Sequence, residues 1–444
     1  MLQSDAPRFI KPSSMSATRR LVLIVFVALL AALPAAPRRA GAIRERDGHN
    51  AFFRPPVNIS HTAGTSRLPR MNPRSLALDP EGPAFCAWVE HVAHTKGTAQ
   101  ELALVRFRVG SGWDSVYASA GRWEGDPSTD PACVIDGGHV LHLVWLEQKP
   151  GARQVVGLRF DLVSGATSEI EPISEPERGA ADPALAVDAD GRAHVVWSEI
   201  ESGRPVLRYR QRGTEGWGPV ERIPSTAGAS AYCADIAADV SGAVHLVWQE
   251  GLANGSAAMY ARRAARGTWA APEMVSEPET GWYTGAPVVA AAGGRVWVVW
   301  AETDGRVGHV ETRLRSGAPG GRVRDHWSTI RRASSDSARV EQPSAVLDPW
   351  GTLHAVWLEK REEGQKLRTA VVYGSLAPGD TVFAWPRPLT LEGAGPFDTP
   401  LIASDATGRV FAAWVDNGIE KGDLECRNGV AGFAALQGML RYHP

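Results

Sequence analysis

The sequence predicts an all-β fold, a seven-bladed β-propeller of four-stranded antiparallel blades, and three observations carry this prediction. Gly (46) and Pro (31) together make up about one residue in six of the 444. This composition suits short strands joined by tight turns and argues against a helical bundle. Trp is unusually common, at 16 residues. Seven of these Trp residues recur roughly every 50 residues within one local pattern, which is the spacing of propeller blades.

The N-terminal segment has the pattern of a secretory signal peptide. Two arginines precede an apolar run from Leu21 to Ala36, and the small residues Ala40-Gly41-Ala42 follow it. A basic start, a short apolar run and an A-x-A site are typical of a signal that is removed during export. We therefore expect residues 1–42 to be a signal peptide, with Met15 as an alternative start. An uncleaved membrane anchor is the other interpretation.

Residues 43–444 are then expected to form one propeller domain, secreted, periplasmic or at the cell surface, with no membrane span after signal cleavage. The net charge of −2 excludes a strongly basic nucleic-acid binder, so no nucleic acid is expected as a partner. No C-x-x-C or zinc-like spacing is present. An oxidising compartment permits disulfides, and the disulfide state stays open for Cys86, Cys133, Cys233 and Cys426.

Each repeat unit contains four strand-like segments. In the third unit they are Pro183–Asp188, Ala193–Glu199, Pro205–Gln211 and Trp217–Ile223. Short turn sequences connect them, so they form an antiparallel meander. A unit of this size with one signature Trp is a propeller blade. The signature residues are Trp88, Trp145, Trp197, Trp248, Trp300, Trp357 and Trp414.

An acidic residue follows each signature Trp two positions later, on the same face of the strand. We expect these acids to pair with arginines of the third strands, because charge-assisted pairing satisfies a partly buried carboxylate. The alternative is a ring of carboxylates at one mouth that binds calcium. The acids are Glu90, Glu147, Glu199, Glu250, Glu302, Glu359 and Asp416, and the candidate partners are Arg106, Arg159, Arg208 and Arg262.

The position three residues before each signature Trp is His in four units and Phe or Trp in the others. A position that accepts Phe is interpreted as a packing position, and no metal ligands are predicted there. The four histidines are His142, His194, His245 and His354.

The chain ends predict how the ring closes. Residues 439–442 copy the third strand of the third unit, so the last unit lacks its own fourth strand. Residues 53–60 resemble a fourth strand and are expected to complete that blade, which leaves no exposed edge. Residues 417–438 form an outsized loop, either functional or covering the seam. Its apolar part, Val430 to Leu436, is expected to form a helical turn or cap.

The repeated text P-x-L-A-V-D-x-x-G-x-x-H-V-V-W-x-E, followed by an apolar-Arg-Tyr strand, resembles the sialidase-like (Asp-box, or neuraminidase-repeat) propellers over roughly residues 53–444. Turns such as Gly110–Trp113 and Thr214–Trp217 are degenerate versions of the family's S-x-D-x-G-x-x-W box. The resemblance implies a propeller fold and, as activity, glycoside hydrolysis. The family's arginine trio and Tyr/Glu pair have no motif counterpart in this chain.

The loops that enter each first strand are expected to surround the channel mouth, where rigid scaffolds carry function. Their aromatic and basic residues suit a sugar or peptide ligand, although they also suit packing on neighbouring loops. The candidate ligand-binding residues are Trp123, Tyr232, Trp282, Tyr283, Phe397 and Arg339. The candidate catalytic carboxyl groups are Asp130, Asp182, Glu341 and Asp398.

The leading functional hypothesis is an exported, non-enzymatic binding platform for a glycan or an extracytoplasmic protein. The first alternative is a divergent glycoside hydrolase, which requires two carboxyl groups roughly 5–10 Å apart. The second is a structural component of an envelope assembly. No cofactor is predicted, with calcium as the one alternative. The sequence leaves the ligand and the oligomeric state open.

Overall fold

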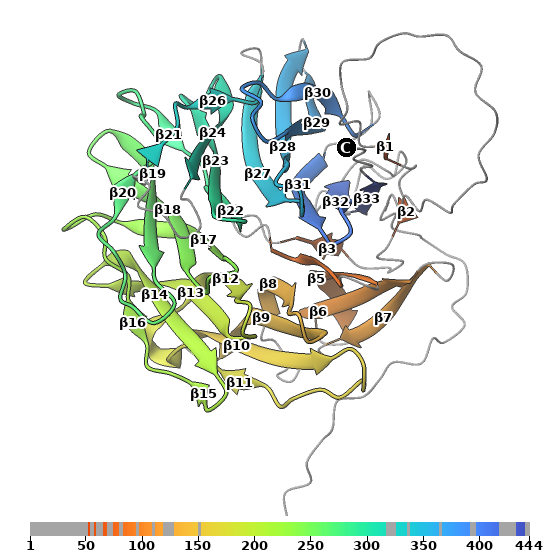
Figure 1. Cartoon of the computed structure of the whole chain (residues 1–444). Helices are drawn as coiled ribbons and strands as arrows, with labels where there is room; N and C mark the ends of the chain where they lie inside the picture. Colours follow the sequence, from red (N-terminus) through yellow and green to blue (C-terminus); the bar gives the residue numbers. More distant parts are fainter. Residues whose placement is uncertain are drawn as a thin grey trace, which may run out of the picture.

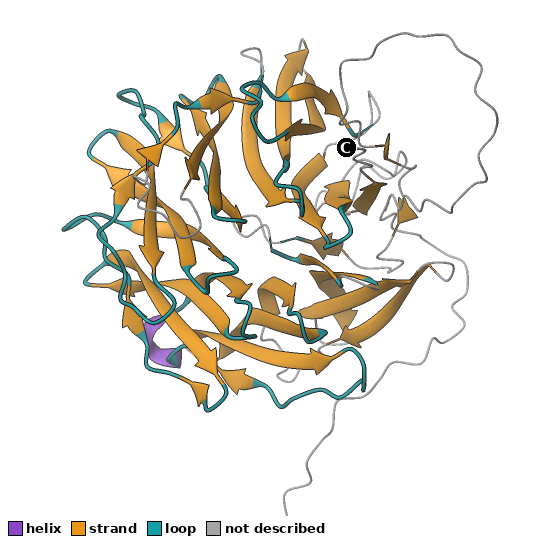
Figure 2. Ribbon diagram, in the orientation of Figure 1, coloured by secondary structure: helices purple, strands orange, loops and turns teal. Residues whose placement is uncertain are grey.

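The computed structural model describes residues 74–79, 83–94, 97–108, 112–118, 128–149, 152–316, 326–334, 338–363, 366–390, 397–416 and 432–439, and the short strands within 52–53, 57–58 and 65–68. Seven antiparallel sheets stand around a central axis (Figure 1). Strands dominate, with a single 3-10 turn, η1 (Pro176–Arg178), in the described part of the chain (Figure 2). The all-β, seven-bladed fold is therefore confirmed.

The first four blades run in chain order. Blade 1 contains β3 (Thr65–Arg67), β4 (Leu76–Leu78), β5 (Ala84–His94), β6 (Gly97–Arg108) and β7 (Gly112–Ala118). Blade 2 contains β8 (Ser128–Ile135), β9 (Val140–Lys149), β10 (Ala152–Asp161) and β11 (Glu171–Pro172). Blade 3 contains β12 (Ala181–Val187), β13 (Ala193–Glu201), β14 (Arg204–Gly213), β15 (Gly216–Trp217) and β16 (Glu221–Arg222). Blade 4 contains β17 (Ala231–Ala238), β18 (Val244–Leu252), β19 (Gly255–Arg263) and β20 (Glu273–Met274).

The remaining three blades complete the ring. Blade 5 contains β21 (Tyr283–Thr284), β22 (Val288–Ala292), β23 (Arg295–Thr303), β24 (Gly308–Ser316), β25 (His326–Trp327) and β26 (Arg331–Arg332). Blade 6 contains β27 (Arg339–Leu347), β28 (Leu353–Glu363), β29 (Lys366–Leu376) and β30 (Ala384–Pro388). Blade 7 contains β31 (Phe397–Ser404), β32 (Arg409–Asp416) and β33 (Gly432–Met439), together with β1 (Phe52–Phe53) and β2 (Val57–Asn58) from the other end of the chain.

The N-terminal strands close the ring as predicted. Phe52 and Phe53 pair with Met439 and Gly438, and β2 pairs with residues 434–435 of the same strand. The outer edge of β33 is therefore covered, so blade 7 does not end in an exposed third strand. Residues 1–42, the predicted signal peptide, lie outside the described residues. Within the described part, no helix is long and apolar enough to cross a membrane.

The third strand of blade 7 differs from the prediction. It is β33, Gly432–Met439, and it pairs with β32 from Arg409↔Met439 to Asp416↔Gly432. The predicted helical turn at Val430 to Leu436 is therefore wrong where it overlaps this strand, and residues 440–444 lie outside the described residues. An apolar run of this length fits a strand as well as a helical turn, so its periodicity could not separate them. Pairing with β32 satisfies the backbone groups of both strands.

The signature Trp side chains form the packing between blades. All seven are at most 2% exposed. Trp197 lies in a cluster with Leu146 and Ile173 of the preceding blade, and Trp300 lies with Val247 of its preceding blade. Because an indole is large and flat, one residue per blade fills the space between two twisted sheets.

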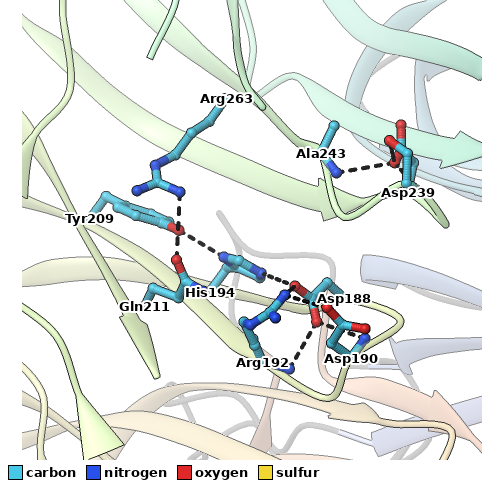
Figure 3. A network of polar contacts seen from close by, with 10 residues as sticks. Asp188, Asp190, Arg192, His194, Tyr209, Gln211, Asp239, Ala243 and Arg263 are labelled. Atoms are coloured by element: carbon cyan, nitrogen blue, oxygen red, sulfur yellow. Dashed lines mark hydrogen bonds and ion pairs between the residues drawn. The ribbon is translucent and has the colours of Figure 1, made fainter. Parts of the chain in front are cut away.

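His194 shows the hydrogen-bonded network that these histidines enter at the turn between the first two strands (Figure 3). His194 Nε2 lies 3.3 Å from the Oδ2 atom of Asp188, and His194 Nδ1 lies 2.7 Å from the hydroxyl of Tyr209. The Asp188 Oδ1 atom accepts the backbone N–H groups of Asp190 and Arg192. Burial opposes ionisation of Asp188, but these donors outweigh it and lower its pKa to about 2. The packing interpretation of these histidines is thus correct but incomplete.

Candidate functional site

The innermost strands of five blades share a backbone irregularity at one end of the channel. Each has a non-glycine residue with a left-handed φ of 46–53°, and four of the five stand directly before a proline. The pairing register with the second strand shifts at the same place in each case, which is a β-bulge. Bulges redirect a side chain next to functional sites. The residues are Asp130, Asp182, Cys233, Gln342 and Thr399.

This bulge ring defines the candidate site. Its members lie at the entry of the innermost strands, which surround the axis (Figure 1). Holding a residue in the left-handed region before proline is unfavourable by about 1–3 kcal/mol. Since the bulge recurs around the ring, it belongs to the blade architecture. The chemistry of the mouth is then set by which side chain each blade places there.

Blades 2 and 3 place carboxyl groups on the ring at adjacent, equivalent positions. Both Asp130 and Asp182 are half-buried. The pKa of Asp182 is raised to about 6, first by burial and then by the negative charge of Asp130, while Arg153 opposes the rise. Burial also raises the pKa of Asp130, against a hydrogen bond from Thr129 and the charge of Arg153. Two of the four predicted carboxyl groups therefore occupy equivalent bulges of adjacent blades.

Cys233 is the next member of the ring, on the other side of Asp182. Its thiol is buried, and its pKa is raised to about 12 by burial and by the charge of Asp182. The thiol is thus neutral and unreactive at physiological pH.

An ion pair spans the channel just inside the ring. The guanidinium group of Arg74, in blade 1, donates two hydrogen bonds to Asp235 of blade 4, at 2.8 Å and 2.9 Å. Arg74 also donates to the carbonyl of Val289, whose N–H donates to Asp235 at 2.8 Å. A cavity of about 240 Å³ lies along the channel and is lined by residues of all seven innermost strands, with Arg74 among them. The ion pair therefore forms part of the floor of the mouth.

Blade 6 presents a compensated charge cluster instead of a free carboxylate. Glu341 lies 2.7 Å from Arg339 and 2.6 Å from Lys360. Next to it, the side-chain oxygen of Gln342 accepts the N–H of Thr399 at 2.9 Å, which ties blades 6 and 7. Glu341 and Arg339 thus bind each other, and neither is joined to the Asp130–Asp182 pair by any contact in the described residues.

The predicted aromatic residues divide into packed and exposed ones. The ring of Trp282 stacks on His309 at 5.6 Å, and its carbonyl accepts the N–H of Ser256. Tyr283 is 55% exposed, whereas Tyr232 is half-buried. Trp123 lies outside the described residues. Phe397 and Asp398 belong to β31, but their side chains are outside the described part.

The acids that follow the signature Trp residues have a second role that the sequence analysis missed. The indole N–H of Trp197 donates to Glu199 at 2.8 Å, and Trp248 and Trp357 donate to their acids in the same way. The predicted arginine pairing holds for Arg208, which donates to Glu199 at 3.1 Å. It is wrong for Arg159, which lies 3.9 Å from Glu171 of the fourth strand. No cluster of three potential metal ligands occurs among the described residues.

Blade 5 departs from this pairing of an acid with an arginine of the third strand. The residue opposite Trp300 is Glu311, where blade 3 has Arg208 opposite Trp197. Glu302 is 6% exposed and Glu311 is 8% exposed, and the Glu302 Oε1 atom has no hydrogen-bond partner. Burial raises the pKa of Glu302 to about 8, and the nearby Glu311 adds to the rise. Glu302 therefore keeps its proton at neutral pH, buried beside a second carboxyl group.

Sequence reasoning did not find Arg74, Arg153 or Glu311. The repeated x-Pro pairs at the start of each unit did carry a signal, because a residue before proline is restricted and often marks an irregular strand.

No protein-family model matches the chain, and no curated protein matches it. Two solved structures of an ulvan lyase share the fold, each at 10% identity with a TM-score of 0.55. One, bound to a saccharide of GlcA and sulfated rhamnose, covers 83% of this chain and 93% of its own. The other covers 87% of this chain and 94% of its own. A sialidase from Streptococcus pneumoniae has 11% identity and a TM-score of 0.43, covering 85% and 68%. At these identities the likeness concerns the fold alone.

Proposed function

We propose that this propeller is a glycan-active protein that cleaves glycosidic bonds at the mouth of its channel. The observation that carries the proposal is the pair of Asp130 and Asp182 on adjacent bulges, with the pKa of Asp182 raised to about 6. Acid–base glycoside hydrolysis uses two carboxyl groups with different pKa values, so that one is protonated while the other is ionised. A saccharide is the first substrate class to test because the structures of the same fold include a polysaccharide lyase bound to one.

In this proposal the two carboxyl groups have different roles. Asp182, with its pKa raised to about 6, holds its proton at mildly acidic pH and donates it to the leaving-group oxygen. Asp130 ionises first and acts either as the base that activates water or as the nucleophile. The floor formed by Arg74 and Asp235 limits how deeply a sugar enters.

The test is hydrolysis of a panel of polysaccharides and aryl glycosides, with products identified by mass. Hydrolysis adds one water per cleaved bond, whereas elimination adds none. Asp182→Asn and Asp130→Asn should each lower kcat/KM by about 10²–10⁴-fold. Asp190→Asn, an exposed acid on a turn between first and second strands, is the matched control and should keep full activity. Cleavage that survives both mouth substitutions would refute these roles.

A non-enzymatic glycan-binding platform is the second candidate, and one observation favours it. Tyr283 presents an exposed ring beside the ordered Trp282–His309 stack, and exposed aromatic faces are typical of sugar-binding surfaces. A glycan array separates the two candidates. Binding without product release, lost in Tyr283→Ala and retained in Asp182→Asn, would support the platform and exclude the hydrolase.

A further inference from the structure

We infer that Ser75 is a positioning residue that holds the strained bulge of blade 2 and thereby fixes the carboxyl group of Asp130. The hydroxyl of Ser75 donates to the carbonyl of Pro131, the residue after Asp130, at 2.5 Å. Ser75 belongs to blade 1 and is fully buried, so it acts through the backbone of the next blade. Its catalytic meaning rests on the proposed function, whereas the contact itself does not.

The ladder between β8 and β9 is interrupted at this bulge. Asp130 has a left-handed φ of 52°, and the pairing register shifts between Thr129 and Ala132. A bulge leaves its extra residue outside the ladder, and Pro131 has no N–H group to donate. A strained backbone of this kind persists only where its surroundings fix it. Contacts from outside the ladder are therefore needed to hold Asp130 in place.

Blade 1 supplies such contacts from two consecutive residues. Besides the bond from Ser75 to Pro131, the carbonyl of Arg74 accepts the N–H of Cys133 at 2.7 Å. Ser75 is held in turn, because its own carbonyl accepts the N–H of Ala87 in β5 at 2.8 Å. Blade 1 thus holds the chain at the first and the third residue after the bulged carboxyl group.

The ion pair across the channel anchors the same segment of blade 1. The side chain of Arg74 donates two hydrogen bonds to Asp235 of blade 4 and one to the carbonyl of Val289 of blade 5. Because Ser75 follows Arg74 directly in the chain, this anchor fixes the position from which the hydroxyl of Ser75 reaches Pro131.

The equivalent position in another blade provides a comparison. Ser75 contacts the residue before its signature Trp, and the residue that does so in blade 6 is Ser344. Ser344 is 1% exposed, and its hydroxyl oxygen accepts the N–H of Ile402 in blade 7 at 3.1 Å. Ser344 therefore makes the same kind of contact with the next blade, at a junction that carries neither Asp130 nor Asp182.

The bulge that carries Asp182 is held differently. At the position equivalent to Ser75, blade 2 has Ala132, which has no hydroxyl group to offer blade 3. Instead, Ser198 of blade 3 itself donates to the carbonyl of Ala181, directly before Asp182, at 3.2 Å. Loss of the Ser75 hydroxyl should therefore disturb one carboxyl group of the pair and leave the other in place.

The expected effect on catalysis follows from geometry. A catalytic group must be held within about 0.5 Å of its productive position, and a misplacement of about 1 Å can lower the rate about 100-fold. Ser75→Ala leaves the carbonyl of Pro131 without this donor, so Asp130 is free to shift. Because Ser75 is buried and touches no sugar, the loss should appear in kcat while KM stays unchanged.

The first experiment measures the kinetics of two serine variants on a polysaccharide that the wild type cleaves. Ser75→Ala should lower kcat by about 10–100-fold with the same KM. Ser344→Ala removes an equally buried hydroxyl at the other junction, so it should lower thermal stability to a similar extent and keep full kcat. An unchanged kcat in Ser75→Ala, or an equal loss in Ser344→Ala, would overturn the positioning role.

Hydrogen–deuterium exchange of the full protein gives a readout that needs no activity. In Ser75→Ala the amides of β8 should exchange about 2–10-fold faster, the factor that one net hydrogen bond represents. The amides of β12 and β31 should keep their wild-type rates. Ser344→Ala should accelerate β31 and leave β8 unchanged.

The two readouts fail separately. A wild type that cleaves no saccharide but shows this exchange pattern would sink the proposed function and leave the hold of Ser75 on the bulge standing. Exchange of β8 that is unchanged in Ser75→Ala would overturn the inference.

Discussion

At the scale of single residues, the structure shows what the acid after the signature Trp does in blades 3, 4 and 6, where it accepts the indole N–H. A buried indole N–H needs an acceptor, and a residue two positions later on the same strand face is placed to supply one. In blade 3 the carboxylate of Glu199 accepts from Trp197 with one oxygen and from Arg208 with the other. The Trp and the acid two positions later could be recognised in the sequence as a repeat. The hydrogen-bond donor to the acid could not, since an arginine and an indole are both suitable donors.

The buried carboxyl pair of blade 5 makes stability depend on pH. Glu302 holds its proton up to about pH 8 in the folded protein, whereas its ordinary pKa is 4.5. The folded state therefore binds the extra proton between these values, and the free energy of unfolding falls as pH rises from about 4.5 to 8. Glu302→Gln has no proton to release, so it avoids this fall in the free energy of unfolding. The substitution should stabilise the protein by about 1–2 kcal/mol at pH 8, with little gain at pH 5.

Denaturant unfolding at the two pH values checks this prediction. The control is Glu215→Gln, which replaces an exposed acid in the β14–β15 turn. It should change the free energy of unfolding by a similarly small amount at both pH values. An identical effect of Glu302→Gln at pH 5 and pH 8 would show that the folded protein does not raise the pKa of Glu302.

At the scale of the elements, the third strands of blades 3, 4 and 5 each connect their blade to the preceding one. The side chain of Arg212 in β14 binds Glu171 of blade 2 at 2.8 Å and 2.9 Å, and Trp217 donates to the same acid. Arg263 with Glu221, and Arg315 with Glu273, repeat this contact at the next two junctions. Sequence analysis assigned third-strand arginines to acids of their own blade. Periodicity locates such a residue on a strand face, but it does not reveal which neighbouring sheet covers that face.

The histidine network of blades 3, 4 and 6 gives a prediction at this scale. In each of these blades a third-strand Tyr contacts the His, whereas blade 1 has Phe85 at the His position and Leu104 at the Tyr position. Tyr209→Phe leaves a buried polar atom of His194 without its partner and should cost about 1–2 kcal/mol. His194→Phe in the same protein replaces both partners by apolar groups and should recover part of that cost.

A double-mutant cycle of thermal unfolding measures this coupling. Additive effects of Tyr209→Phe and His194→Phe would show that the two side chains do not stabilise each other. The cycle leaves the contact with blade 4 in place, where the guanidinium group of Arg263 lies over the Tyr209 ring at 5.3 Å. Phe keeps that ring, so the cation–π contact should persist and leave the measured coupling to the hydroxyl.

At the scale of the whole molecule, the sequence predicts the ring and its closure but not the contacts across the axis. Seven similar units and a strand-like N-terminal segment are sufficient to predict a closed propeller, because closure is how such a sheet array avoids exposed edges. The chemistry of the channel mouth could not be predicted in this way. It depends on the few positions where blades depart from the repeat, such as Asp130, Asp182 and Asp235. Which of these meet is decided by the geometry of the ring and not by spacing along the chain.

The Arg74–Asp235 pair is the clearest such contact, since it joins blades 1 and 4 across 161 residues of sequence. The Asp235 side chain is 1% exposed and that of Arg74 is 23% exposed. Asp235→Asn leaves the guanidinium without its charged partner and should lower the free energy of unfolding by about 3 kcal/mol, the low end for breaking a buried pair because Arg74 keeps some solvent. Adding Arg74→Met removes the unpaired charge and should return part of the loss.

Since the pair holds opposite sides of the ring together, the single variant should also unfold faster in denaturant. Equilibrium and kinetic unfolding of the two variants check both effects. A cost below about 0.5 kcal/mol, the usual effect of a surface substitution, would show that the ring is held by its blade-to-blade packing alone.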